Sequence, residues 1–155
     1  MKILKFNKNE DHRGIFRRIF CKKILKSLKI NFEIKQVNCS YNPNKLTLRG
    51  LHYQSGRYAE EKIIYCTKGK LFFVSVNIEK KSKNYLSYNE VILSQEDDKI
   101  LYISKNHATG FLTLTKNTEL IYLMSNYYNP KFSKGILYSD KKININWPHK
   151  PLVIS

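Results

Sequence analysis

Hydrophobic and polar residues alternate along most of this chain. Seven short segments that follow the turn Asn42-Pro43-Asn44 are rich in β-branched or aromatic residues and are separated by polar turns. They are LTLRGLHYQ (46–54), EKIIYCT (61–67), KLFFVSVNI (70–78), LSYNEVILS (86–94), KILYIS (99–104), GFLTLT (110–115) and ELIYLMSNYY (119–128). Short strands at such regular spacing predict an antiparallel sandwich or barrel.

The first third of the chain gives mixed signals. GIFRRIF (14–20) and NFEIKQVNCSYN (31–42) alternate as strands do, whereas CKKILKSLKI (21–30) has the apolar spacing of a short helix. No other window sustains the helical period. No repeat or low-complexity linker is visible, so we expect residues 1–155 to form a single all-β domain with a short N-terminal helix.

Composition indicates the cellular compartment of the protein. Hydrophobic residues make up 42% of the 155 residues, which is typical of a folded globule. The three cysteines, Cys21, Cys39 and Cys66, are an odd number without the spacing of a disulfide framework. The N-terminus lacks the apolar stretch of a signal peptide, and no later run is long enough to cross a membrane. We therefore expect a cytoplasmic protein with reduced thiols.

The formal net charge of +16 raises the question of an anionic partner. Nucleic acid, a membrane surface and a phosphorylated small molecule are the candidates. Most of the excess is lysine scattered through turns and termini, which favours a solvated surface over a nucleic-acid interface. Arginine binds phosphate groups better than lysine does. Arg13 and Arg49 are therefore the candidate phosphate ligands, and we expect neither nucleic acid nor membrane as a partner.

Three ionisable side chains lie within otherwise apolar strands. Alternation places His52 and Gln54 on one face of their strand, with Leu51 and Tyr53 on the other. Lys62 shares a face with apolar neighbours in the next strand, and Tyr122 is flanked by Ile121 and Leu123. Taken singly, a strand histidine such as His52 is more often a hydrogen-bonded structural residue than a catalyst, and Lys62 could be a charge that protects an edge strand. Together in one interior they would make a poor core but a usable site.

Several kinds of site are excluded by spacing. A metal-binding barrel usually carries two histidines at i and i+2, but Gln54 occupies the position two residues after His52. No nucleophile elbow of a serine hydrolase and no glycine-rich phosphate loop is present. We therefore expect no metal site.

The combination of motifs resembles the dTDP-4-dehydrorhamnose 3,5-epimerase family. The resemblance runs from Asp11 to Pro148 with order and spacing preserved. It rests on DHRGIF, QVN at 36–38, LRGLHYQ, EKIIY, GKLFFVSVNI, LSQEDDKILYIS, GFLTLT, ELIYLMSNYYNP and GILYSDKKININWP. It implies a cupin-type jelly roll and a homodimer that exchanges N-terminal strands. It also implies an isomerase that inverts carbons beside the ketone of a nucleotide-linked 4-keto-6-deoxy sugar, in polysaccharide pathways such as O-antigen synthesis. The resemblance further implies that this reaction uses neither a metal nor an organic cofactor.

The same resemblance implies roles for individual residues. His52 matches the general base, Lys62 the cation that stabilises the enolate, and Tyr122 the general acid. The positions that hold the nucleotide and diphosphate are Arg13, Gln36, Asn38, Arg49, and Tyr127 or Tyr128. The residue types suit this chemistry, because a neutral imidazole accepts a proton near neutral pH and an ammonium group stabilises an oxyanion. A buried tyrosine stays protonated and can donate to an enolate.

Three positions depart from the family pattern. Thr109 stands where a second active-site histidine is expected, and His107, two residues earlier, is a possible substitute. Phe73 replaces an aspartate in the strand after Lys62, and no counterpart of the aspartate that orients the base is found up to Ser155. Inversion at C3 or C5 alone therefore stays open beside double inversion. A cupin 3,4-ketoisomerase and a catalytically degenerate nucleotide-sugar-binding paralogue are the alternative interpretations.

Overall fold

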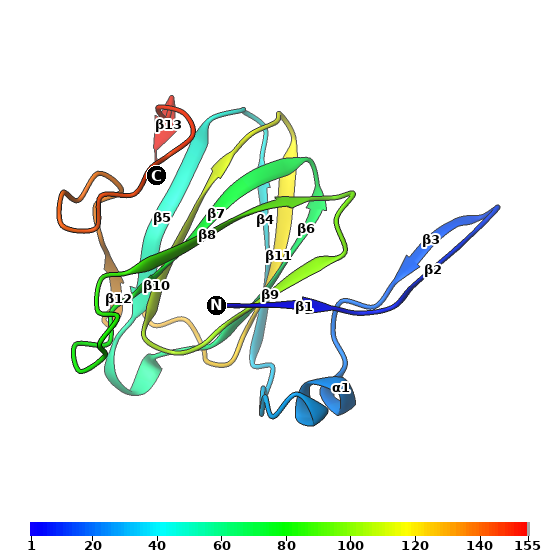
Figure 1. The fold of residues 1–155 in the computed structure, drawn as a ribbon, viewed down its shortest axis with the longest axis horizontal. Coiled ribbons are helices and arrows are strands. Elements are labelled where there is room, and N and C mark those ends of the chain that lie inside the picture. Colours follow the sequence, from blue (N-terminus) through cyan, green and yellow to red (C-terminus); the bar gives the residue numbers. More distant parts are fainter. Residues whose placement is uncertain (155) are drawn as a thin grey trace.

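The computed structural model describes residues 1–154 and is built almost wholly from antiparallel strands (Figure 1). The first sheet has the order β1-β9-β6-β11-β4. Its strands are β1 (Lys2–Lys5), β9 (Lys99–Ile103), β6 (Lys62–Lys68), β11 (Thr118–Met124) and β4 (Gln36–Asn42). Neighbouring strands pair antiparallel throughout this sheet.

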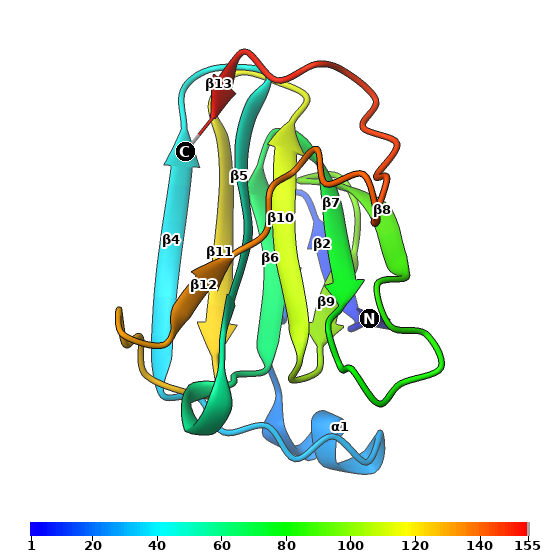
Figure 2. The same ribbon diagram turned by 90° about the vertical axis from the view of Figure 1, so that its left-hand side faces the viewer.

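The second sheet packs face to face with the first and has the order β12-β5-β10-β7-β8 (Figure 2). Its strands are β12 (Ser133–Gly135), β5 (Thr47–Gln54), β10 (His107–Thr113), β7 (Lys70–Asn77) and β8 (Tyr88–Ser94). A short strand, β13 (Val153–Ile154), pairs parallel with β5. All seven segments expected to be strands after the turn at Pro43 are strands, so the all-β, antiparallel prediction is confirmed.

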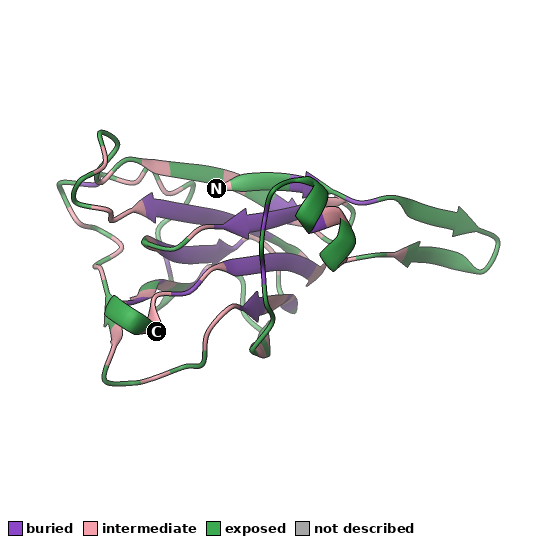
Figure 3. Cartoon of the chain, turned by 90° about the horizontal axis from the view of Figure 1, so that it is seen from below, coloured by how far each residue is buried: buried purple, intermediate pink, exposed green. Residues whose placement is uncertain are grey.

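Alternation within the strands sorts apolar side chains into separate clusters. In β7, Leu71 and Phe73 point between the sheets, whereas Phe72, Val74 and Val76 point to the outer side of the second sheet. The inner cluster joins both sheets, and the outer one is covered by the C-terminal segment. That covering layer contains Ile136, Tyr138, Ile143 and Trp147. Figure 3 shows the central strands buried between these layers.

The predicted N-terminal helix is confirmed as α1 (Lys22–Ser27). Its Leu25 is fully buried against the outer face of the first sheet, together with Ile30 and Phe32 from the segment that follows. This face of the sheet is apolar because alternate residues of β6, Ile63 and Tyr65, point toward the helix. The helix therefore closes one outer face and leaves the space between the sheets to the strands.

Two further strands form a hairpin that the sequence pattern predicted only in part. They are β2 (Lys8–Asp11) and β3 (Gly14–Arg17), and the hairpin extends away from the two sheets (Figure 1). The pattern gave no sign of β2 because KNED contains no apolar residue. Arg13 lies in the turn, where its guanidinium pairs with Asp11 at 2.7 Å. No helix among residues 1–154 combines the length and hydropathy needed to span a bilayer.

Strand β5 carries an irregularity that strict alternation does not foresee. His52 pairs with Thr109 and Arg49 with Phe111, so Gly50 and Leu51 together oppose the single residue Gly110. The extra residue brings Arg49 and His52 to the same face, although they are three positions apart. Gly50 has φ +114°, and a Cβ there would lie 2.5 Å from the Cα of Gly110. Only glycine fits this backbone at the close approach of the two strands.

Candidate active site

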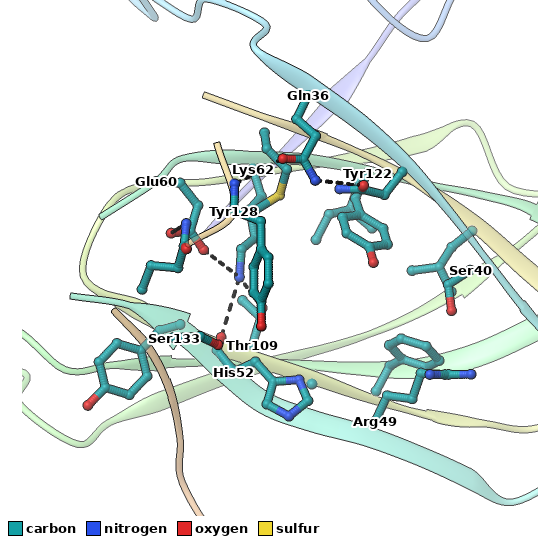
Figure 4. A pocket seen from close by; sticks show the side chains of 18 of the residues that line it. Gln36, Ser40, Arg49, His52, Glu60, Lys62, Thr109, Tyr122, Tyr128 and Ser133 are labelled. Atoms are coloured by element: carbon teal, nitrogen blue, oxygen red, sulfur yellow. Dashed lines mark hydrogen bonds and ion pairs between the residues drawn. The ribbon is translucent and has the colours of Figure 1, made fainter. Parts of the chain in front are cut away.

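A cavity of about 550 Å³ opens between the two sheets (Figure 4). Its apolar lining consists of Ile64, Phe73, Phe111, Leu120 and Met124. Polar side chains point into the cavity from β4 and β11 of the first sheet and from β5 and β10 of the second sheet. The volume suits a small-molecule ligand, and the mixture of apolar walls with a few polar groups is typical of a binding site.

His52 reaches the cavity from β5 of the second sheet. Its imidazole makes no hydrogen bond to any group within residues 1–154. Burial first, and then the positive charges of Lys62 and Arg49, lower the pKa of His52 below its usual 6.5. A lowered pKa keeps the ring neutral near pH 7, and a neutral ring with free nitrogens is able to accept a proton.

Lys62 reaches the same cavity from β6 of the first sheet but is almost fully buried. Its Nζ lies 3.2 Å from Oε1 of Glu60 and donates to Oγ1 of Thr109 at 2.9 Å and to the carbonyl oxygen of His52 at 3.4 Å. Burial lowers the pKa of Lys62, and the adjacent Glu60 carboxylate opposes that shift. The buried acid therefore compensates the buried cation.

Glu60 connects this ion pair to the mouth of the cavity through Gln54. The side-chain amide of Gln54 donates to Oε2 of Glu60 at 3.2 Å and to the carbonyl oxygen of Tyr127 at 3.1 Å. Its Oε1 accepts the backbone N–H of Asn129 at 2.6 Å. Gln54 thus fixes the loop after β11 to the charged pair, and the loop carries Tyr128 at the rim.

Tyr122 lines the cavity from β11, on the sheet opposite to His52 (Figure 4). It is half-buried, and burial raises the pKa of its hydroxyl above 10, against an opposing effect of Arg49. The phenol is therefore protonated at neutral pH and has a proton to give. His52 and Tyr122 therefore line the same cavity from opposite sides.

Arg49 supplies the cavity with a positive charge that no acid within residues 1–154 neutralises. Its Nε donates to Oδ1 of the fully buried Asn42 at 2.7 Å. The amide of Asn42 in turn donates to the backbone carbonyl oxygen of Thr118 at 3.2 Å, so the guanidinium has a fixed support. An oriented guanidinium without an acidic partner is suited to bind a phosphate or carboxylate.

Gln36 and Asn38 line the cavity from β4 and are hydrogen-bonded to each other at 2.8 Å. Oε1 of Gln36 also accepts the backbone N–H of Tyr128 at 2.9 Å. Tyr128 is 61% exposed at the cavity mouth. The three residues form a connected polar edge with an aromatic ring at its end, where a heterocyclic base could stack.

Thr109 and Phe73, two of the positions that depart from the family pattern, both lie in the cavity wall. Phe73 is 2% exposed and packs with Leu71 and Phe111. Thr109 accepts the hydrogen bond from Lys62 already described. Neither side chain can titrate near neutral pH, so neither Thr109 nor Phe73 can replace His52 or Tyr122 in proton transfer.

Three residues expected at the site lie elsewhere. His107 starts β10 outside the cavity lining, and its Nδ1 lies 3.0 Å from the carbonyl oxygen of Lys105. The ring is therefore too far along the strand to replace a histidine at position 109. Tyr127 points away, with the Nζ of Lys35 at 5.9 Å from its ring centre. Arg13 lies on the exposed hairpin.

The sequence gave no reason to select Glu60 or to link Lys62 with Thr109. Glu60 follows a 3₁₀ turn, Gly56–Tyr58, in a polar connection that resembles solvent-exposed loop. Glu60 is nevertheless only 7% exposed. A charged residue two positions before Lys62, at the start of a strand whose residues are buried, was the only available signal. Among residues 1–154, no three His, Cys, Asp or Glu side chains are grouped as metal ligands.

Comparison with known proteins agrees with this geometry. The sequence profile of the dTDP-4-dehydrorhamnose 3,5-epimerase family matches residues 1–155. The enzyme of that name from Shigella flexneri is 39% identical over 139 residues, which cover 89% of this chain and 76% of the relative. The Escherichia coli enzyme is 35% identical over 139 residues, covering 89% and 75% of the two chains. The chain belongs to the dTDP-4-dehydrorhamnose 3,5-epimerase family.

Solved structures support the same assignment. The Bacillus anthracis enzyme, crystallised with TDP and PPi, superposes with a TM-score of 0.95 at 32% identity, covering 99% of this chain and 87% of the other. The Legionella pneumophila enzyme, in complex with dTDP-4-keto-L-rhamnose, gives 0.94 at 32% identity, covering 99% and 81%. The expected jelly roll and the expected isomerase class are confirmed. Epimerisation beside the ketone of a nucleotide-linked 4-keto sugar is likewise confirmed at the level of the family.

Proposed function

We propose that this protein inverts one or both carbons beside the ketone of a nucleotide-linked 4-keto-6-deoxy sugar, with His52 as base and Tyr122 as acid. The observation that carries the proposal is that these two groups enter one cavity from opposite sheets. Inversion needs removal of a proton on one face of the carbon and its return on the other. A free imidazole facing a protonated phenol meets that requirement.

The reaction starts when His52 accepts the proton from the carbon beside the ketone. The C–H electron pair moves into the new carbon–carbon double bond, and negative charge develops on the ketone oxygen. The buried ammonium of Lys62 stabilises this enolate electrostatically, since its field acts in a site with little water. Tyr122 then donates its proton to the opposite face of the carbon. The imidazolium and the phenolate return to their starting states by exchange with solvent.

Nucleotide recognition is assigned to the polar edge of the cavity. Arg49 faces the site without an acidic partner and would bind the diphosphate. Gln36, Asn38 and Tyr128 form the connected edge at the mouth and would hold the nucleoside. Such a substrate places this enzyme in deoxysugar and polysaccharide biosynthesis.

The test follows the sugar ring protons in heavy water. The protein is incubated with dTDP-4-keto-6-deoxy-D-glucose and, in parallel, with the GDP- and CDP-linked 4-keto sugars, and NMR records deuterium incorporation at C3 and C5. Exchange at both carbons indicates double inversion, and exchange at one indicates the narrower activity. Product analysis separates movement of the ketone between C3 and C4. Nucleotide binding without any exchange would identify a degenerate paralogue and overturn the enzymatic proposal.

The exposed hairpin gives a reason to propose a homodimer with exchanged N-terminal strands. Ile15 and Phe16 are 48% and 67% exposed on it, and Arg13 lies at its turn, apart from its own cavity. If Arg13 holds nucleotide, as the family resemblance implies, it must reach the cavity of a second copy. Light scattering of the purified protein measures the mass of the assembly.

Complementation tests the exchange itself. Arg13→Ala and His52→Asn subunits are co-expressed, so that a mixed dimer contains one cavity with both intact groups. Recovery of roughly a quarter of the wild-type rate is expected, since half the dimers are mixed and half of their sites are intact. No recovery above either variant alone would contradict strand exchange.

A further inference from the structure

The ammonium of Lys62 has three N–H groups, and each already has an acceptor within the protein. Glu60 takes one at 3.2 Å, Thr109 another at 2.9 Å, and the carbonyl oxygen of His52 the third at 3.4 Å. Figure 4 shows the contacts to Glu60 and Thr109 as dashed lines. A substrate oxygen would have to displace one of these acceptors to bond directly to Lys62.

The Thr109 hydroxyl is in the opposite situation. Its oxygen accepts the shortest of the three Lys62 bonds, but among residues 1–154 its own proton has no acceptor. Thr109 is 8% exposed and lines the cavity, so the unmatched donor is nine-tenths buried at the cavity wall. A hydroxyl that accepts from an ammonium group becomes a stronger donor, because hydrogen bonds in a chain polarise one another.

Position on the sheet places this hydroxyl beside the base. Thr109 is the cross-strand partner of His52, so both side chains point to the same face of the second sheet. The ketone oxygen is bonded to the carbon next to the one that loses its proton. When His52 removes the proton, the enolate oxygen must therefore lie close to the base. A hydrogen-bond donor adjacent to His52 is within reach of that oxygen.

We propose that Thr109 donates the hydrogen bond to the enolate oxygen and is a catalytic residue, with Lys62 acting through it and Glu60 positioning Lys62. The inference rests on the proposed epimerase function and specifies its oxyanion site. No proton leaves Thr109 in the cycle, and its O–H bond stays intact. The hydrogen bond from Thr109 becomes stronger as negative charge develops on the substrate oxygen. The oxygen that accepts this hydrogen bond is that of a ketone whose neighbouring carbon carries the acidic C–H.

The central variants are Thr109→Val, which keeps the shape and removes the hydroxyl, and Thr109→Ser, which keeps the hydroxyl. Loss of a single oxyanion-hole donor lowers kcat by about 10²–10³-fold, and we expect that loss for Thr109→Val. KM and the affinity for dTDP alone should change by less than about threefold, because the donor acts in the transition state rather than on the nucleotide. Thr109→Ser should retain the rate within about tenfold. Deuterium exchange into dTDP-4-keto-6-deoxy-D-glucose measures all three proteins.

A matched control is available in the same strand pair. Ser75 is the cross-strand partner of Thr109 on the side away from His52, is 1% exposed, and has a hydroxyl with no hydrogen-bond partner among the described residues. It does not line the cavity. Ser75→Ala should leave the exchange rate unchanged. A large loss in Ser75→Ala would mean that this part of the wall responds to any change of packing, and would count against the assignment to Thr109.

A second comparison separates donation by Thr109 from simple support of Lys62. The variant Glu60→Gln/Lys62→Met removes the charged pair without leaving an unpaired buried charge and keeps the Thr109 hydroxyl. If Thr109 touches the substrate oxygen, Thr109→Val loses at least as much rate as the double variant. If Lys62 donates directly and Thr109 only supports it, the double variant loses much more. That order, or a Thr109→Val rate within fivefold of wild type, would overturn the proposal.

The wild-type protein is measured in the same assay. Absence of exchange in the wild type with the dTDP-, GDP- and CDP-linked 4-keto sugars contradicts the epimerase function itself. Exchange in the wild type together with an active Thr109→Val variant contradicts only the role of Thr109. The two failures are therefore distinguishable in one experiment.

Discussion

The two walls of the cavity hold their charged side chains in opposite ways. On the first sheet, Lys62 is buried and surrounded by Glu60, Thr109 and a backbone carbonyl group. On the second sheet, the ring of His52 has no hydrogen-bond partner within residues 1–154. A group that supplies a constant charge benefits from rigid support, because preorganised dipoles and charges cost no reorganisation during the reaction. A group that must accept a proton needs a free nitrogen, which is what His52 offers.

The difference also separates stability from function. Removing one member of a buried ion pair leaves a charge without compensation, whereas removing a side chain that makes no hydrogen bond leaves nothing unsatisfied. We therefore expect changes at Lys62 to affect folding and catalysis together. Changes at His52 should affect catalysis only. The following experiments test that division, in order of expected effect.

The largest effect is expected for His52→Asn. The exchange rate should fall by about 10⁴-fold, the upper end of what a general base contributes, because the asparagine amide cannot accept the proton. Stability and dTDP affinity should stay close to wild type, since the imidazole makes no hydrogen bond within residues 1–154. NMR exchange, urea unfolding and calorimetric titration measure the three quantities. Unchanged exchange would show that the base is wrongly assigned.

Lys62→Met should give the largest loss of stability. It leaves the buried Glu60 carboxylate unpaired, and breaking such a pair lowers the free energy of unfolding by about 3–5 kcal/mol. Adding Glu60→Gln should restore most of that loss, because the amide needs no counter-ion. Urea unfolding of the single and double variants measures both values. Equal stability of the two variants would mean that the ion pair is not buried in solution.

Tyr122→Phe should separate proton removal from inversion. The base is intact, so deuterium still enters the carbon from the His52 side, but the opposite face has lost its donor. We expect formation of the inverted product to fall by about 10²-fold or more while exchange with retention continues. Comparing NMR washout with the amount of inverted sugar measures the two processes. If inversion and washout fall together, Tyr122 serves both steps and is not simply the acid.

The smallest effect concerns pH. Only neutral His52 is active, so kcat/KM should fall as the pH decreases through the pKa of the free enzyme. Burial, Lys62 and Arg49 lower the pKa of His52, which places this decline below pH 6.5. In Glu60→Gln/Lys62→Met the positive charge of Lys62 is gone, and the decline should move to higher pH. A pH profile of both proteins, with NMR titration of the His52 ring, measures the shift. An unmoved midpoint would show that the Glu60–Lys62 pair has no net effect on the imidazole.

The sequence alone predicted the elements and most of the side chains that matter. Period-two alternation is a local property, so it located the seven strands from β5 to β11. The apolar spacing of residues 21–30 likewise located α1. The resemblance, which depends on the order of motifs, identified His52, Lys62 and Tyr122, and all three line the cavity.

Only the tertiary structure decided how those residues are connected. The extra residue in β5 turns Arg49 to the same side as His52, and strict alternation would have placed them on opposite faces. The sequence pattern around Glu60 is typical of a polar loop, but folding of the chain brings Glu60 against Lys62 and buries both residues. His107 has the strand parity of Thr109, but its distance along β10 leaves it outside the cavity. Local pattern specifies which face a residue takes, whereas register, bulges and burial between distant segments specify its neighbours. The chemistry of the site depends on those neighbours.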